Sequence, residues 1–561
     1  MATHSPDKAA TGAAAGKPQK AKPAKAPGIR QTMSDLHIWT GLLAGWILYA
    51  MFLTGTVSYF RDEISQWMRP DVPAQLQLAD AAELAPRLVA TMQALAPASP
   101  QWGISLPDAR DNTAGAFWRG EKRFESATFD PATAQPIEVR DSVGGEFFYR
   151  FHFQLHYLPV LWGRWLAGLC AMFMLVAIVS GVITHKKIFI DFFTFRWGKG
   201  QRSWLDAHNA LSVLGLPFHL MITYTGLVTL MLMYMPWGSD AAFKEAAQRQ
   251  AMQSEISAFI RPDKPSGQPA ELAPVAGMIQ QAQARWGRDG IGNVNVNNPG
   301  DAAARVIVVR ADDARVSTSP QYMVFDGANG QLLQTKDRVG AAAETRGVMY
   351  ALHLGRFSDY PLRWLYFLVS LAGTAMVGTG LVMWTVKRRA RLPDPARPHV
   401  GFRLVEKLNI ATIAGLSVAM AAFFWGNRLL PEALADRKVW EVDLLFIVWG
   451  ATLAYALLRP AKRAWIELLW LAAALLALLP LLNGLTTERN LLHSIAAGDW
   501  VFTGFELTVL AFGGLHALLA VRVRRHQPKT RPAPRQSKPA PPVAAPHAGL
   551  SALQAASTES R

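Results

Sequence analysis

Histidine is the residue type whose spacing in this chain suggests chemistry. His37 lies eighteen residues before the glycine of a Thr-Gly pair at Gly55. His208 lies eighteen residues before the glycine of a second Thr-Gly pair at Gly226, and an aspartate stands two residues before each histidine. The neutral imidazole is a common metal ligand, so histidines that recur at matched positions are candidates for a repeated metal centre.

A second pair of histidines recurs in two Leu-His dipeptides, at His156 and His353. Each dipeptide is followed by an Arg-Trp pair, at Arg164 and Arg363, and then by a Ser-Gly or Thr-Gly pair. These matches predict a tandem duplication of a unit made of a span, a soluble segment and a second span. Because each unit has an even number of spans, equivalent residues near the pseudo-twofold axis would face each other.

Two imidazoles opposed across such an axis can occupy both axial positions of a haem iron, an arrangement suited to electron transfer. We therefore predict that His37 faces His208 near one membrane surface and that His156 faces His353 near the other. Two such pairs would form a two-haem path, with irons on the order of 30 Å apart. A histidine at a helix end can also serve as a simple interfacial or hydrogen-bonding group.

Three further histidines are candidates for haem ligation, namely His219, His185 and His152. His219 follows His208 by eleven residues, which places it about 16 Å deeper on nearly the same helix face, and Pro217 can kink the helix between them. An ionisable group at that depth is costly and usually functional. Neither of the other two has a symmetric counterpart. Two alternative pairings stay open: His219 with His353, and His37 with His185.

Other residues of the repeated pattern have two interpretations each. Arg164 and Arg363 could bind carboxylates such as haem propionates, or they could anchor their spans at the membrane interface. The four small dipeptides would let helices approach closely and would also leave room for a flat porphyrin. These dipeptides are Thr54-Gly55, Ser180-Gly181, Thr225-Gly226 and Thr379-Gly380.

The composition indicates a membrane protein. Hydrophobic residues make up 51% of the 561 residues and charged residues only 17%. Eight apolar segments are long enough to span a bilayer, near residues 37–60, 158–184, 207–235, 362–386, 405–427, 441–458, 464–483 and 500–521. Every second connection between them is basic, as are both tails. By the positive-inside rule, both termini then lie in the cytoplasm of a bacterium, and the protein lies in the inner membrane.

Two long connections fall on the opposite, periplasmic side. Each begins with a helical pattern, at residues 82–96 and 271–286, and continues with short strands around a turn led by Asp130 or Asp326. Each connection is therefore predicted to form a small α+β domain. The fold class is an all-α polytopic membrane protein of eight transmembrane helices with two such domains.

The predicted parts follow in this order: a disordered basic cytoplasmic tail at 1–30, a span at 31–60, an α+β domain at 61–150, a span at 151–185, a cytoplasmic loop at 186–203, a span at 204–237, a second α+β domain at 238–349, a span at 350–386, a cytoplasmic linker at 387–404, a four-helix membrane module at 405–521, and a disordered basic cytoplasmic tail at 522–561.

Several kinds of site are excluded by the sequence. The net charge of +16 comes from tails and alternate loops rather than from one folded face, so nucleic acid is not the expected partner and membrane lipid is. The single cysteine, Cys170, supports neither a disulfide framework nor a cysteine-based metal site. No Gly-rich nucleotide-binding motif is present, so the electron donor must be external, either a quinol or a cytoplasmic flavoprotein.

Several of these motifs together resemble one family. They are Asp35-Leu-His37-Ile-Trp-Thr-Gly41 with Leu53-Thr-Gly55, Trp204-Leu-Asp-Ala-His208, the Leu-His pairs at 156 and 353, and the two Phe-Asp turns. Over about residues 30–390 the chain resembles PepSY-associated transmembrane proteins, and among these it is most similar to the iron-regulated, haem-containing ferric-siderophore reductases. The resemblance implies PepSY-like soluble domains, two b-type haems between four spans, and an oxidoreductase that reduces periplasmic Fe(III)-siderophore and releases Fe(II). We expect the substrate to bind between the two α+β domains.

Residues 405–521 depart from that family pattern because they add four spans. Glu506 and His516 within the last span could mark a quinone or proton site, although incidental packing is the simpler interpretation. Two rival functions remain. One is a non-catalytic membrane protein whose soluble domains bind or regulate a periplasmic protease or sensor. The other is a transporter, which the sequence favours less because the spans are expected to lack the buried acidic residues or broken helices that coupled transport usually shows.

Overall fold

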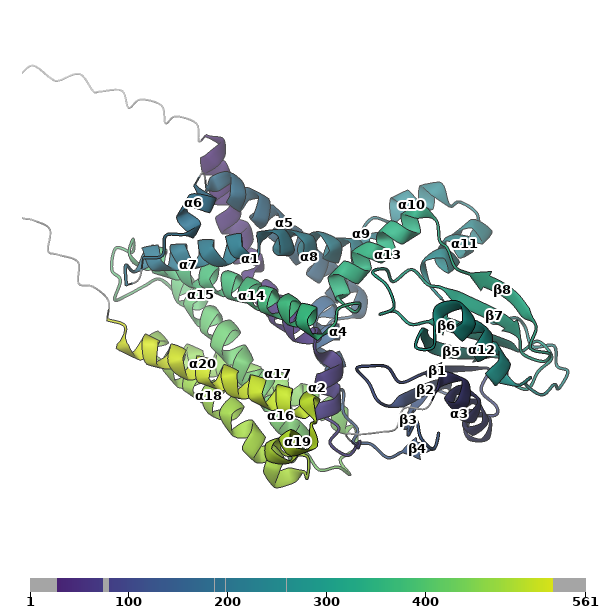
Figure 1. Cartoon of the computed structure of the whole chain (residues 1–561). Coiled ribbons are helices and arrows are strands. Elements are labelled where there is room, and N and C mark those ends of the chain that lie inside the picture. The colour runs from purple at the N-terminus through teal and green to yellow at the C-terminus, as the bar shows by residue number, and fades with distance from the viewer. Residues whose placement is uncertain (1–27, 74–79, 186, 197, 259, 528–561) are drawn as a thin grey trace, which may run out of the picture.

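The computed structural model describes residues 28–73, 80–185, 187–196, 198–258 and 260–527. It consists of a helical bundle with an antiparallel sheet at one end (Figure 1). We call this end the sheet side of the bundle. The two predicted disordered tails lie largely outside the described residues. Where they are described, residues 29–30 and 522–525 are helical, so the first helix begins earlier and the last helix ends later than expected.

The first half of the bundle contains α1 (Ile29–Ser58), α2 (Arg61–Trp67), α4 (Glu146–Gln154), α5 (Val160–Thr184), α6 (Ile188–Phe192), α7 (Gln201–Leu214), α8 (Leu216–Thr229), α13 (Ala341–Leu354) and α14 (Tyr360–Arg389). Helix α1 packs against α5 and α14, and α14 also packs against α7. The shorter helices α4 and α13 pack on α1 and α8 respectively at the sheet side.

Within the described residues, seven helices are long and apolar enough to cross a membrane, or eight if one bent pair counts as a single span. The bent pair is the predicted third span, in which α7 and α8 meet at an angle of 69°. Gly215 separates the two helices and Pro217 occupies the first turn of α8. Proline lacks the backbone N–H that would continue the α7 ladder, so the expected kink becomes a break. The expectation that no span is a broken helix is therefore wrong.

The strands of both long connections form one continuous sheet rather than two separate sheets. They are β1 (Gln101–Ser105), β2 (Ala114–Arg119), β3 (Phe124–Phe129), β4 (Pro136–Ile137), β5 (Ile291–Asn297), β6 (Arg305–Arg310), β7 (Tyr322–Asp326) and β8 (Leu332–Lys336). The eight described strands are all antiparallel, in the order β4-β3-β2-β1-β5-β6-β7-β8. Strands β1 and β5 join the halves, with Gly103 opposite Asn295. The expected space between two domains is therefore occupied by a hydrogen-bonded strand pair.

Two helices cover one face of this sheet: α3 (Ala81–Leu95) and α12 (Val275–Trp286). They pack against each other, and their apolar residues share one core with alternate residues of the strands, including Trp102, Val294 and Phe325. Both Asp-led turns form as predicted, since Asp130 and Asp326 accept backbone N–H groups within their turns. Three short helices precede α12: α9 (Met231–Tyr234), α10 (Pro236–Ala242) and α11 (Ala246–Ile256).

The C-terminal module contains α15 (Val400–Ile410), η1 (Ala411–Gly415), α16 (Leu416–Leu429), α17 (Arg437–Leu458), α18 (Ala461–Thr486), α19 (Leu491–Ala497) and α20 (Trp500–Arg525). Helices α15, η1 and α16 run as one continuous span, Val400–Leu429. Buried Asn409 attaches the module to the first half. Its amide accepts the Trp46 indole N–H at 2.9 Å and donates to the Leu381 carbonyl at 3.0 Å.

Candidate functional site

One histidine pair lies at the end of the bundle opposite the sheet. His37 of α1 and His208 of α7 face each other with their ring centres 6.2 Å apart and their planes at 75°. The sequence pattern predicted this juxtaposition. Both side chains are partly buried between α5 and α14.

A second pair lies at the sheet side, but one of its members differs from the expected one. His353 of α13 faces His152 of α4, with ring centres 6.1 Å apart. His156 is instead exposed, stacked on Phe446 of α17 at 5.5 Å and beside Tyr157. The expected opposition of His156 and His353 is therefore wrong.

The course of the chain explains this exchange. Helix α4 ends at Gln154, and the next residue, Leu155, has a positive φ of 53°. A right-handed α-helix requires a negative φ, so the helix cannot continue through Leu155. His152 lies in the last turn of α4 and His156 lies beyond it, whereas α13 continues through His353 to Leu354. Relative to the helix ends, His152 is thus the counterpart of His353.

Each of the four paired imidazoles is held by a backbone carbonyl of a neighbouring helix. Nδ1 of His37, His208 and His152 lies 2.8, 2.9 and 2.7 Å from the carbonyl oxygens of Ala177, Met376 and Met51. His353 is bonded to the Ile222 carbonyl, and its Nδ1 also lies 3.2 Å from the Thr225 hydroxyl. A carbonyl can only accept, so in His37, His208 and His152 the proton is on Nδ1 and Nε2 keeps its lone pair. Metal-binding histidines usually have this arrangement.

The Ser-Gly and Thr-Gly pairs make room for these rings. Each bonded carbonyl belongs to the residue four positions before one of the four glycines, so ring and glycine lie on the same helix face. A Cβ at Gly55 would lie 2.6 Å from the His152 ring, and one at Gly226 would lie 2.8 Å from the His353 ring. At Gly181 and Gly380 the corresponding distances are 3.2 and 3.3 Å. These glycines therefore accommodate imidazoles, a role that helix contact alone did not suggest.

The spacing of the rings suits a shared metal atom. Two metal–nitrogen bonds of about 2 Å, with each nitrogen about 1 Å from its ring centre, place the ring centres about 6 Å apart. Both pairs have this separation. Along α1, His37 and the carbonyl that binds His152 are fourteen residues apart. That corresponds to about 21 Å between the two levels, less than the 30 Å expected from the sequence.

His219 lies between the two levels but is not opposed to another histidine ring among the described residues. Its Nε2 lies 3.2 Å from the Val369 carbonyl, and its ring packs edge-on against Phe52. Its Nδ1 is buried and has no hydrogen-bond partner within the described part of the chain. The nitrogen of His219 that bonds a carbonyl is Nε2, whereas in His37, His208 and His152 it is Nδ1. The alternative pairing with His353 does not form, because His353 faces His152.

The remaining predicted residues have other surroundings. His185 caps the C-terminal end of α5, and His37 faces His208 rather than His185. Arg164 donates to the Gln154 side chain at 3.0 Å and lies over the Phe153 ring. Arg363 is buried, with 4% of its surface exposed, and is paired with Glu63 at 3.0 Å. The Arg363 guanidinium, which was predicted as a possible contact of a haem propionate, is therefore already partly engaged by Glu63.

Glu506 of α20 belongs to a buried polar network at the sheet side of the C-terminal module. It accepts from the Asn483 amide at 2.6 Å and from the Trp67 indole at 3.4 Å, so the module is bonded to α2. Arg428 continues the network by donating to Asn483 and to the Trp67 carbonyl. His516 bonds to the Phe512 carbonyl of its own helix.

All four paired histidines lie within a region of the chain that matches a known family model. Residues 34–387 match the model of the PepSY-associated TM region, which covers more than half of the chain. The chain belongs to this family. It is a multi-pass membrane protein of the PepSY-associated type, and α15 to α20 lie outside the matched region. A search of curated proteins found no match.

In this PepSY-associated protein, His152 is recognised from the helix ends that the structure shows and not from the sequence pattern. His152 and His353 each lie in the last turn of a short helix that precedes a span. Matching helix ends rather than Leu-His dipeptides would have aligned them. The dipeptide match failed because α4 and α13 end at different distances from that dipeptide.

Proposed function

We propose that this PepSY-associated protein is a membrane-bound oxidoreductase that passes electrons across the bacterial inner membrane to periplasmic Fe(III)-siderophore. In this proposal one b-type haem is held by His37 and His208, and a second by His152 and His353. The observation that carries the proposal is the arrangement of the four imidazoles. In each pair the rings lie at a separation that suits a shared metal, and the Nδ1 bonds of His37, His208 and His152 leave their Nε2 lone pairs available.

Haem with two imidazole ligands supplies reversible one-electron chemistry and leaves no open position for oxygen. The chain's own residues fix the ligands. Each Nδ1 hydrogen bond holds the tautomer and the ring orientation, and each glycine keeps the adjacent helix surface clear. Because the pairs lie at two levels of the bundle, they would form a route from one membrane surface to the other.

The orientation is also part of the proposal. The basic residues at the ends of α14 and α20 and the loop after α5 lie away from the sheet, which supports cytoplasmic termini and a periplasmic sheet. The repeated contacts of His37 with α5 and of His208 with α14 support a tandem duplication. The donor would be a membrane quinol or a cytoplasmic flavoprotein.

Reduction alone would release the iron. Fe(III) is held by hard oxygen donors, and one added electron weakens that hold, so no protein nucleophile is required. Fe(II) would then leave the siderophore in the periplasm.

The test is haem content and the spectrum of the dithionite-reduced protein, purified after expression with ample haem. We expect a b-type α-band, half of which is lost in His152→Ala and in His353→Ala because either change removes one axial ligand of the same haem. His156→Ala should keep the full haem content, since this ring is exposed and faces Phe446.

A preparation without any b-type band would refute the proposal. It would favour the alternative of a non-catalytic PepSY membrane protein that binds or regulates a periplasmic protease or sensor. Equal haem loss in His156→Ala and His152→Ala would instead refute the ligand assignment.

A further inference from the structure

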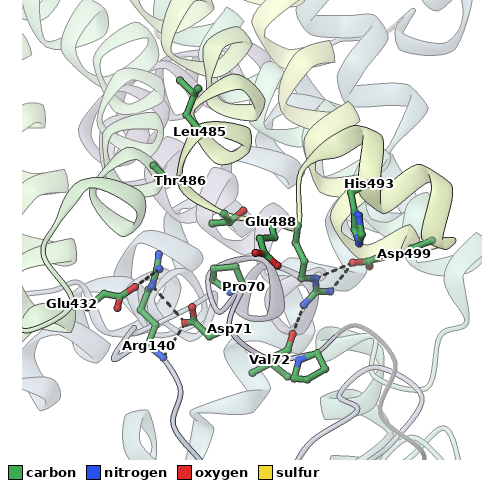
Figure 2. Close-up of a pocket in the computed structure, with 14 residues that line it drawn as sticks. Pro70, Asp71, Val72, Arg140, Glu432, Leu485, Thr486, Glu488, His493 and Asp499 are labelled. Carbon is green, nitrogen blue, oxygen red and sulfur yellow. Dashed lines mark hydrogen bonds and ion pairs between the residues drawn. The ribbon is translucent and has the colours of Figure 1, made fainter.

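A cavity of about 750 Å³ opens at the sheet side of the C-terminal module. It lies between the segment that follows α2, the loop before α17, and the turn from α18 into α19 (Figure 2). Its volume is in the range of sites for small molecules. Because its walls come from both halves of the chain, it exists only in the assembled molecule.

Two arginines form the side walls, and both are already engaged by carboxylates. Arg140 donates to Glu432 at 2.6 Å and lies 3.6 Å from Asp71. Arg489 donates to Asp499 at 2.6 Å and to a backbone carbonyl. These cations therefore stiffen the walls and offer little to an anionic ligand.

The cavity has an excess of negative charge. Its lining contains the carboxylates of Asp71, Glu432, Glu488 and Asp499 but only the two guanidiniums, which leaves two negative charges when His493 is neutral. Glu488 lies between the two ion-paired walls and is exposed. Among the described residues its carboxylate has no hydrogen-bond or ion-pair partner, so it is available to a ligand.

An aromatic cluster connects this wall to the helix that carries His152. Phe148 of α4 lies 5.9 Å from Phe424, and Phe424 lies 5.8 Å from Trp67, by ring centres. Trp67 is fully buried and ends α2, three residues before Pro70 of the cavity wall. Packed aromatic rings thus link α4, the helix that carries His152, to α2, the helix that leads into the cavity wall.

From the cavity, its charge and this connection we infer that it binds the ferric chelate, and that it selects complexes with a positive or zero net charge over anionic ones. This inference rests on the proposed function. It gives the C-terminal module a role in substrate binding, with Glu488 as the residue that determines charge preference. The redox step adds one electron to Fe(III) and forms Fe(II). If the donor is a quinol, its oxidation to the quinone reduces two Fe(III) and releases two protons on the donor side; a reduced flavoprotein would supply the electrons in the same way.

The test separates binding from reduction by using Ga(III), which has the charge of Fe(III) and is not reduced. The full-length protein in detergent is titrated by calorimetry with the Ga(III) complex of a linear trihydroxamate that keeps a free ammonium group. A Ga(III) tris-catecholate, which is a trianion, is the comparison ligand. We expect the cationic complex to bind and the trianion to bind at least about tenfold more weakly.

Glu488→Lys should weaken binding of the cationic complex about tenfold, Glu488→Asp should retain it within about threefold, and salt should weaken the wild type. The matched control is Glu121→Lys, which makes the same charge change at an exposed position of the β2–β3 hairpin. Haem content should be the same in all three variants.

Unchanged binding in Glu488→Lys, or tighter binding of the trianion, would overturn the inference while leaving a haem-containing reductase intact. Conversely, normal charge-selective binding by a protein without haem would overturn the proposed function and leave the cavity assignment standing. The two failures are therefore distinguishable.

Discussion

A ring, a carbonyl and a glycine lie together at each of the four paired histidines. In each case an imidazole reaches the helix beside it, bonds to a carbonyl, and lies over the glycine four residues later. The carbonyl determines which ring nitrogen remains available, and the absent Cβ determines how closely the ring can approach. The glycines are therefore as important as the histidines for the placement of each ring.

Substituting these glycines should have graded effects. Gly226→Ala would place a methyl group 2.8 Å from the His353 ring, whereas Gly380→Ala would place one 3.3 Å from the His208 ring. We expect Gly226→Ala to lose most of the haem held by His152 and His353. Gly380→Ala should lose at most a small part of the haem held by His37 and His208. Haem per polypeptide and the α-band measure this.

Gly41→Ala is the matched control because it lies within α1 and nothing lies within 4 Å of its added Cβ. A helical glycine replaced by alanine there should stabilise the protein by about 0.5–1 kcal/mol. If Gly41→Ala and Gly226→Ala lose haem equally, steric contact with the ring is not the reason for the glycine.

At the scale of elements, α3 and α12 are held together by one carboxylate. Asp80 caps α3 by accepting from the Ala82 N–H at 2.8 Å, and it also accepts from Gln283 of α12 at 2.9 Å. Arg288, just after α12, pairs with the same carboxylate. Arg288 first, and then the bonds from Gln283 and Ala82, lower the pKa of Asp80 to about 2.

Asp80→Ala should therefore destabilise the sheet and its helices at neutral pH by about 1 kcal/mol, mostly through the lost helix cap. Because the pKa of Asp80 is lower in the folded protein than in the unfolded chain, its carboxylate contributes to the free energy of unfolding above the unfolded pKa, near 4. This contribution is lost as the pH falls towards the folded pKa of about 2. The difference in melting temperature between wild type and variant should thus shrink between about pH 4 and pH 2. Thermal unfolding followed by tryptophan fluorescence measures it.

The exposed Glu121 provides a control, since Glu121→Ala removes a carboxylate from the same sheet. It should change the melting temperature little at any pH. A destabilisation by Asp80→Ala that stays constant down to pH 2 would assign the effect to packing rather than to the charge.

At the scale of the whole molecule, three parts of the chain meet at Glu63. Its carboxylate, 6% exposed, accepts from Arg363 of α14 at 3.0 Å and from Arg110 of the β1–β2 loop at 2.8 Å. Glu63 itself belongs to α2, which also contacts α20. This carboxylate therefore ties the sheet to the bundle.

Removing that carboxylate should cost far more than removing a surface one. Glu63→Ala leaves two neighbouring guanidiniums without their shared partner, and we expect a loss of about 3–5 kcal/mol. Increased proteolysis of the β1–β2 loop and a lower melting temperature would show it. Glu146→Ala, which removes an exposed partner of Arg150, should cost under about 1 kcal/mol. Equal losses in the two variants would show that Glu63 does not join the parts.

The sequence by itself determined the features that depend on local pattern. Apolar length predicted the spans, Asp-led turns predicted the hairpins, and recurring His37 and His208 predicted one opposed pair. Such features follow from helix length, turn chemistry and repeated spacing, all of which are encoded in short segments.

Tertiary structure alone decided which residues meet. Ending α4 before Leu155 brought His152 rather than His156 to His353, because a helix end fixes the direction of each side chain. Pairing of β1 with β5 merged two soluble segments into one sheet, since backbone groups at a free strand edge bind whichever edge is brought beside them. The cavity beside Glu488 likewise has walls from segments more than 400 residues apart, and no local pattern could reveal it.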